Sequence, residues 1–239
     1  IVVAIVVLLQ AGLAYIAAKQ LLAIGLDATP ETYALLIEAV PPVERIGFDA
    51  TLMGILPMIV LGAVFGASEF KTNTLRTTLL SVQRKGLVFA SKLTVLLVGA
   101  WAISFVSIVV SIHVTHIALG EAGLPLFVLT PWAWKGMLFT SIAWTGLTTL
   151  AFAMGLLFRT AVVPLLFLIP QVYNGSSFLA ERFPIARLLP VAAGNALVPT
   201  SAQSLPGSPW DHVLVLTAWI VVLGVMAYLR FRLSEGRSV

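Results

Sequence analysis

The sequence contains no cysteine and few charged residues, and each absence excludes a class of protein or site. Without cysteine there is no disulfide, no thiolate metal site and no cysteine nucleophile, although the redox compartment stays undetermined. Charged residues make up 10% of the 239 residues, whereas soluble domains carry about 25%. Hydrophobic residues make up 59%, and they fall into runs near the roughly 20 residues that cross a hydrocarbon core. The composition predicts an all-α, multi-pass integral membrane protein.

The motifs of ATP hydrolysis and zinc proteolysis are also absent. No Walker A pattern occurs, so this chain is not expected to bind ATP by a P-loop, and no HExxH occurs. We therefore expect no catalytic residue, no metal site and no cofactor in this chain. His113 and His116 lie three residues apart, but no third metal ligand accompanies them. We interpret them as polar anchors near a membrane interface.

One serine-containing stretch leaves an enzyme as an alternative. Ser176 follows Asn174 and Gly175 near the end of an apolar run. A serine nucleophile needs a base within hydrogen-bond reach, and only His212 is expected at a comparable depth. An intramembrane hydrolase acting at Ser176 or His212 is therefore kept as an alternative function.

Six apolar runs predict six transmembrane helices in a single transmembrane domain. The third is long enough to tilt or to project beyond the bilayer. No internal repeat is visible, which argues against a transporter that is complete within one chain. The first run begins at Ile1 without a methionine or a basic segment, so we expect a further N-terminal segment and not a signal peptide. The predicted spans are 1–24, 50–68, 86–114, 133–158, 161–178 and 210–231.

Lys and Arg are distributed unevenly between the two sides of this arrangement. Cytoplasmic loops are enriched in these residues, so both termini and the loop between the second and third spans are expected in the cytoplasm. Nine lie on that side, namely Lys71, Arg76, Arg84, Lys85, Lys92, Arg159, Arg230, Arg232 and Arg237. Four lie on the other side, namely Arg45, Lys135, Arg182 and Arg187, and Lys19 lies within the first span.

The segment between the fifth and sixth predicted spans is apolar but rich in proline. Its prolines are Pro184, Pro190, Pro199, Pro206 and Pro209. Because proline interrupts helices, we expect two short helices here, forming a re-entrant segment at about 183–198 on the outer side. Non-helical backbone at membrane depth must be covered by protein or reached by water. This segment is therefore expected to cap the outer mouth of a path.

Polar side chains within spans are costly in lipid and tend to face the bundle or a cavity. Gln10, Gln171 and Asn174 are therefore candidates for lining a translocation path. Two stripes of hydroxyl residues are instead typical of close helix packing, as is the GxxxG at 62–66. The stripes are Ser104, Ser107 and Ser111 in the third span and Ser141, Thr145 and Thr148 in the fourth.

A basic, amphipathic segment lies between the second and third spans. Residues 69–85 read EFKTNTLRTTLLSVQRK. On a helix at about 69–82, Leu75, Leu79 and Val82 would form one apolar stripe, with basic residues on other faces. The pattern is typical of a docking surface for a cytosolic partner, and also of a helix that rests on anionic headgroups.

The same segment resembles the loop between the second and third spans of ABC-2 type permeases, the membrane subunits of ATP-binding cassette exporters. In that family an acidic residue ends the second span, a Thr-Leu pair follows, and a basic residue precedes a lysine at the foot of the third span. Glu69, Thr74, Leu75, Arg84 and Lys92 match this pattern.

The C-terminal third carries a second part of the resemblance. Residues 188–196, the start of the last span at Trp210 and the basic tail are similar to the re-entrant hairpin and final span of these permeases. The resemblance implies one half of a dimeric exporter domain in a bacterial plasma membrane, paired with a second copy or a paralogue. It also implies an N-terminal amphipathic helix upstream of Ile1.

The partners follow from the same resemblance. A separate ABC ATPase subunit would hold ATP and Mg²⁺, membrane lipids would surround the spans, and no nucleic-acid partner is expected. Coupling to the ATPase would fall to Glu69, Lys71, Thr74, Leu75, Arg76, Leu79 and Arg84. The spans hold no buried acid and no cation cluster, which favours amphipathic or lipophilic cargo such as a drug, a peptide or a lipid-like molecule. A membrane sensor or scaffold that moves no substrate is the alternative.

Overall fold

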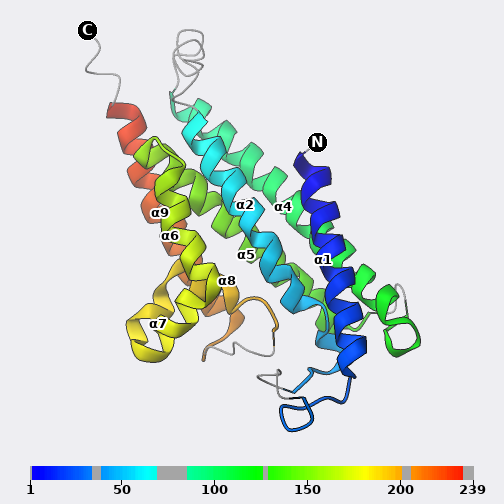
Figure 1. The fold of residues 1–239 in the computed structure, drawn as a ribbon. Coiled ribbons are helices and arrows are strands. Elements are labelled where there is room, and N and C mark those ends of the chain that lie inside the picture. Colours follow the sequence, from blue (N-terminus) through cyan, green and yellow to red (C-terminus); the bar gives the residue numbers. More distant parts are fainter. Residues whose placement is uncertain (1, 34–38, 69–84, 126–128, 201–205, 234–239) are drawn as a thin grey trace.

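The apolar runs form long helices in the computed structural model, which describes residues 2–33, 39–68, 85–125, 129–200 and 206–233. Five helices are long enough and apolar enough to cross a membrane. They are α1 (Val2–Ile24), α2 (Phe48–Ser68), α4 (Lys85–Leu119), α5 (Pro131–Phe158) and α9 (Pro209–Leu233) (Figure 1). No strand occurs in the described ranges, and the chain is an all-α, multi-pass membrane protein.

These five helices coincide closely with the first four predicted spans and the last one. The main difference in length is at α4, which continues to Leu119, beyond the predicted end at residue 114. A short 3₁₀-helix, η2 (Gly120–Ala122), follows it, and another, η1 (Val43–Arg45), precedes α2.

The region of the predicted fifth span, 161–178, is divided between three elements. These are α6 (Val162–Pro170), the π-helix η3 (Gln171–Gly175) and α7 (Ser176–Arg182). Pro170 has no backbone N–H to continue the helical ladder, and the wider π-turn accommodates the change. The apolar part, Val162–Tyr173, is shorter than the five long helices.

A compact group of short elements closes one end of the bundle beside the start of α9. After α7 come the 3₁₀-helix η4 (Pro184–Leu188) and α8 (Pro190–Asn195) (Figure 1). Each begins with a proline at its first turn, where the missing N–H costs nothing. We call residues 183–198 the cap.

The centre of the bundle is α5. Every residue from Ala143 to Leu157 is buried, which no other long helix in the described ranges matches. α2, α4 and α9 pack around it, and α1 lies outside, mainly against α4. The main hydrophobic core includes Ile55 and Met58 of α2 and Trp144 and Leu147 of α5.

The predicted close packing at the GxxxG is confirmed, and its partner is α5. A side-chain carbon built on Gly62 would collide with the Thr148 carbonyl, and one on Gly66 would collide with the Phe152 carbonyl. From the other side, a carbon on Gly155 would lie 2.7 Å from the Ala63 carbonyl. The two backbones therefore approach more closely than any larger residue allows.

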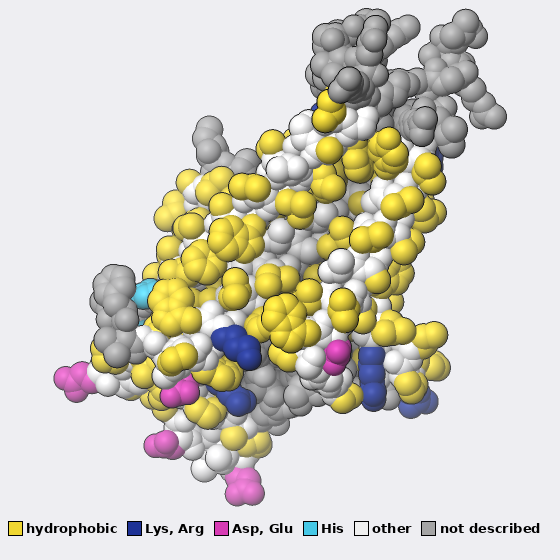
Figure 2. Space-filling view, turned by 180° about the vertical axis from the view of Figure 1, so that it is seen from behind, with side chains coloured by type: hydrophobic (Ala, Val, Ile, Leu, Met, Phe, Trp, Pro, Cys, Tyr) yellow, Lys and Arg dark blue, Asp and Glu magenta, His cyan; other side chains and the backbone are white. Residues whose placement is uncertain are grey.

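The acidic side chains that the structure describes lie at one end of the bundle, where basic side chains are also present (Figure 2). α1 begins and α9 ends toward the end where α2 stops and α4 starts, and the cap lies at the opposite end (Figure 1). Acidic side chains gather at the cap end in Figure 2. The acids whose side chains the structure describes are all exposed, namely Asp27, Glu31, Glu44, Asp49, Glu121 and Asp211.

Candidate functional site

The predicted coupling residues lie outside the described residues. This applies to all seven, Glu69, Lys71, Thr74, Leu75, Arg76, Leu79 and Arg84. The structure does fix the two ends between which they run. α2 ends at Ser68 and α4 begins at Lys85, at the end of the bundle where α9 also ends (Figure 1).

Gln10, a predicted path-lining residue, joins three helices inside the bundle. Its side chain is fully buried. Its Nε2 donates to the Ala50 carbonyl of α2 at 2.9 Å and to the Ser111 hydroxyl of α4 at 3.1 Å. Hydrogen bonds between membrane helices contribute about 0.6 kcal/mol on average. In this structure Gln10 therefore holds α1 to its neighbours.

Several buried polar atoms on α1, α4 and α5 have no hydrogen-bond partner among the described residues. They include Gln10 Oε1, Trp144 Nε1 and the hydroxyls of Ser104 and Ser107. A side-chain carbon built on Gly54 would collide with both Gln10 Oε1 and the Trp144 ring. Trp144, Gln10 and Gly54 thus meet at one point in the core.

The hydroxyl stripe on α5 makes its hydrogen bonds within its own helix. Ser141, Thr145 and Thr148 each donate to the carbonyl four residues earlier, at 2.7–2.8 Å. Thr140 and Thr149 do the same at 2.8 Å. The hydrogen-bonding capacity of these hydroxyls is therefore used within α5 itself. These residues contribute to helix packing through the small size of their side chains.

The other two predicted path-lining residues lie in the π-helix. Gln171 is buried, its Nε2 donates to the Phe167 carbonyl at 2.7 Å, and its Oε1 is buried without a partner in the described part of the chain. Asn174 belongs to the same π-turn, and its side chain lies outside the described atoms. The π-turn is stabilised further by the Ser176 hydroxyl, which donates to the Gln171 carbonyl at 2.9 Å.

That hydrogen bond bears on the hydrolase alternative. Ser176 is buried and its hydroxyl points back to its own helix. No hydrogen bond joins Ser176 to His212, although both residues are described. In this structure the Ser176 hydroxyl is therefore engaged by its own helix and not by His212.

The histidine pair near the end of α4 makes separate backbone contacts. His113 Nδ1 donates to the Val109 carbonyl at 2.8 Å. His116 Nδ1 accepts from the Leu124 N–H at 3.2 Å and so holds the turn after η2 against α4. Groups of three or more potential metal ligands are absent from the described residues.

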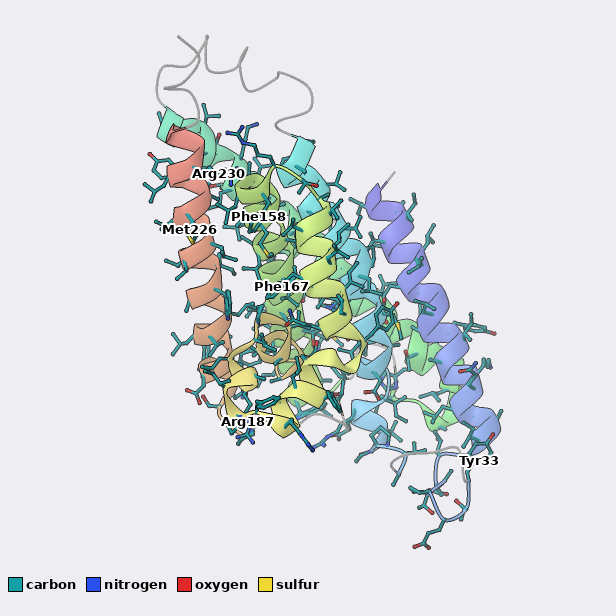
Figure 3. The ribbon with its side chains drawn as sticks, turned by 60° about the vertical axis from the view of Figure 1, so that its left-hand side comes forward. Tyr33, Phe158, Phe167, Arg187, Met226 and Arg230 are labelled. Carbon is teal, nitrogen blue, oxygen red and sulfur yellow. The ribbon has the colours of Figure 1, made fainter. Side chains whose placement is uncertain are left out.

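Besides apolar packing, one side-chain hydrogen bond among the described residues joins the cap to α9. Trp219 Nε1 donates to the Leu188 carbonyl at the end of η4, at 2.7 Å. The Trp219 ring also lies near Phe167 of α6, with ring centroids 6.5 Å apart. In Figure 3, Phe167 lies midway along the bundle, between Phe158 and the cap end where Arg187 lies. Trp219 of α9 therefore contacts both α6 and η4.

Sequence reasoning missed the roles of Trp144 and Gly54. Tryptophan is usually placed at membrane interfaces, so a tryptophan in the middle of a predicted span was a signal for a special contact.

Comparison of the chain with family models, curated proteins and solved structures finds no match.

Proposed function

We propose that this chain is the permease subunit of an ABC exporter, moving an amphipathic or lipophilic molecule with energy from a separate ATPase subunit. The all-α, multi-pass fold supports it, with α6, η3 and α7 taken as a sixth, interrupted crossing. The resemblance of 69–85 and 188–196 to ABC-2 permeases indicates the class. In this proposal both termini and residues 69–84 face the cytoplasm, and the cap faces outward.

The observation that carries the proposal is how α2 is held. Gly62 and Gly66 bring α2 against the backbone of α5, the most buried helix. Residues 69–84 continue directly from α2, so a force on them would reach the core through one closely packed helix. A change of state needs only a contact that differs between the two states. Contacts of Glu69, Lys71 or Arg76 with the ATPase surface would supply it.

Two copies, or this chain and a paralogue, would form the path between them. ATP-driven closure of the ATPase subunits would press on 69–84 and rock the spans, and the cap would gate the outer mouth. Gln10 is fully buried by contacts with α2 and α4. It would therefore line a path only in a state in which α1 has moved away from these helices.

Site-specific crosslinking tests the proposal. A photo-crosslinking amino acid replaces Leu75 or Leu79 in the full chain in its native membrane, and Tyr33, at the cap end (Figure 3), serves as the matched control. We expect positions 75 and 79, but not 33, to crosslink to a protein with a Walker A motif. Crosslinks from positions 75 and 79 to lipid alone would overturn the proposal that this segment docks onto an ATPase. They would favour a helix bound to lipid headgroups. A partner without a nucleotide site would favour the sensor or scaffold.

A further inference from the structure

An open apolar groove of about 700 Å³ runs between the cap and α9. Its walls include Phe183, Ile185 and Leu188 from the cap and Val215, Ala218 and Val222 from α9. Among the described lining residues, the one polar side-chain atom is Trp219 Nε1, and the Leu188 carbonyl already accepts its hydrogen. The volume falls in the range of about 300–1,000 Å³ that ligand pockets occupy, but the lining offers no free side-chain group for a polar ligand.

The groove opens on the outer surface of the bundle. Phe183, Ile185 and Leu188 are 55%, 77% and 53% exposed. α9 is among the least buried of the five long helices, with 17% of its most apolar window covered by the protein. In a bilayer this surface faces hydrocarbon. An acyl chain is therefore the occupant that both the lining and the surroundings favour.

Arginine residues flank the cap side of the groove. Arg187 is exposed and lies between Ala186 and Leu188, which both line the groove. Arg182 is also exposed and precedes Phe183 at the end of α7. Figure 3 places Arg187 at the cap end of the molecule, opposite Arg230. A guanidinium group at this end is positioned for a headgroup, since arginine binds phosphate through two parallel hydrogen bonds.

We propose that this groove binds an anionic phospholipid, with one acyl chain between the cap and α9 and the phosphate at Arg187. The bound chain would fill the space beside the Trp219–Leu188 hydrogen bond and hold the cap against α9. The proposal requires only that the chain spans a membrane. It does not depend on an ATPase partner, so it stands or fails separately from the proposed function.

Photolabelling tests the acyl-chain part. The full chain is reconstituted with phosphatidylglycerol that carries a diazirine in its acyl chain, and labelled peptides are mapped. Ala218→Trp fills the groove, and Val225→Trp is the matched control on the same helix at an exposed position outside the lining. We expect Ala218→Trp to lower labelling of 183–189 at least fivefold and Val225→Trp to leave it unchanged. Equal labelling in both variants would overturn the site, and Ala218→Leu provides a smaller filling if the tryptophan disturbs folding.

Lipid competition tests the headgroup part. Native mass spectrometry compares retention of phosphatidylglycerol and phosphatidylcholine by the wild type and by Arg187→Gln. Arg45→Gln is the matched control, because Arg45 is also exposed but belongs to η1 and lies over the Trp132 ring. We expect the preference for phosphatidylglycerol to fall at least threefold in Arg187→Gln alone. An unchanged preference in that variant would overturn the assignment of the phosphate to Arg187.

Discussion

At the scale of single residues, Gly54 is a position where the core leaves no room for a side chain. Gly54→Ala would place a methyl group against Gln10 Oε1 and the buried Trp144 ring. Overpacking of this kind costs about 1–3 kcal/mol. Gly99→Ala is the control, because nothing lies within 4 Å of the added carbon. Heating in detergent followed by size-exclusion chromatography should show a lower midpoint for Gly54→Ala only, and equal midpoints would contradict the contact.

Two serines on one face of α4 give a second residue-scale prediction. Ser111 accepts a hydrogen bond from Gln10, whereas the Ser107 hydroxyl is buried without a partner in the described chain. Ser111→Ala should therefore destabilise the protein by about 0.6 kcal/mol, and up to about 1.7. Ser107→Ala should be neutral or stabilising, because it removes an unsatisfied buried group. The same thermal assay checks the pair, and a larger loss in Ser107→Ala would refute the assignment.

At the scale of elements, the cap is joined to α9 by apolar packing and by the Trp219–Leu188 hydrogen bond. Trp219→Phe keeps an aromatic ring beside Phe167 but removes the N–H that reaches the Leu188 carbonyl. Hydrogen exchange of amides in 184–198 should become faster, by about fivefold if the bond contributes about 1 kcal/mol. Trp101→Phe, at a surface position of α4 stacked on Phe105, should leave this exchange unchanged. Identical exchange in the two variants would show that the cap is held by other contacts.

The long helices could be predicted because bilayer thickness sets the length of an apolar run without reference to its neighbours. Their pairing could not be predicted in the same way. The Gln10–Ser111 hydrogen bond joins residues 101 positions apart, and nothing in either local sequence specifies the other. The GxxxG indicated close packing but not that α5 is the partner. The interruption at Gln171–Gly175 was missed although Pro170 marks it, because a transmembrane helix can also accommodate a proline without a break.

At the scale of the whole molecule, orientation is open to a direct test because the chain has no cysteine. Tyr33→Cys places a single thiol at the cap end, and Thr160→Cys places one in the turn between α5 and α6 at the opposite end (Figure 1). A membrane-impermeant maleimide should label Tyr33→Cys in intact cells and Thr160→Cys only after permeabilisation. The reverse pattern would place the cap in the cytoplasm and remove the basis for docking at 69–84.

The exporter proposal is tested most sharply by purifying the tagged chain from its native membrane and identifying the proteins that accompany it. We predict that a stoichiometric subunit with a Walker A motif and ATPase activity accompanies the chain. Leu75→Asp combined with Leu79→Asp should abolish this association while the chain still elutes as a folded species. A chain that purifies alone, or with a partner that lacks a nucleotide site, would contradict the exporter proposal.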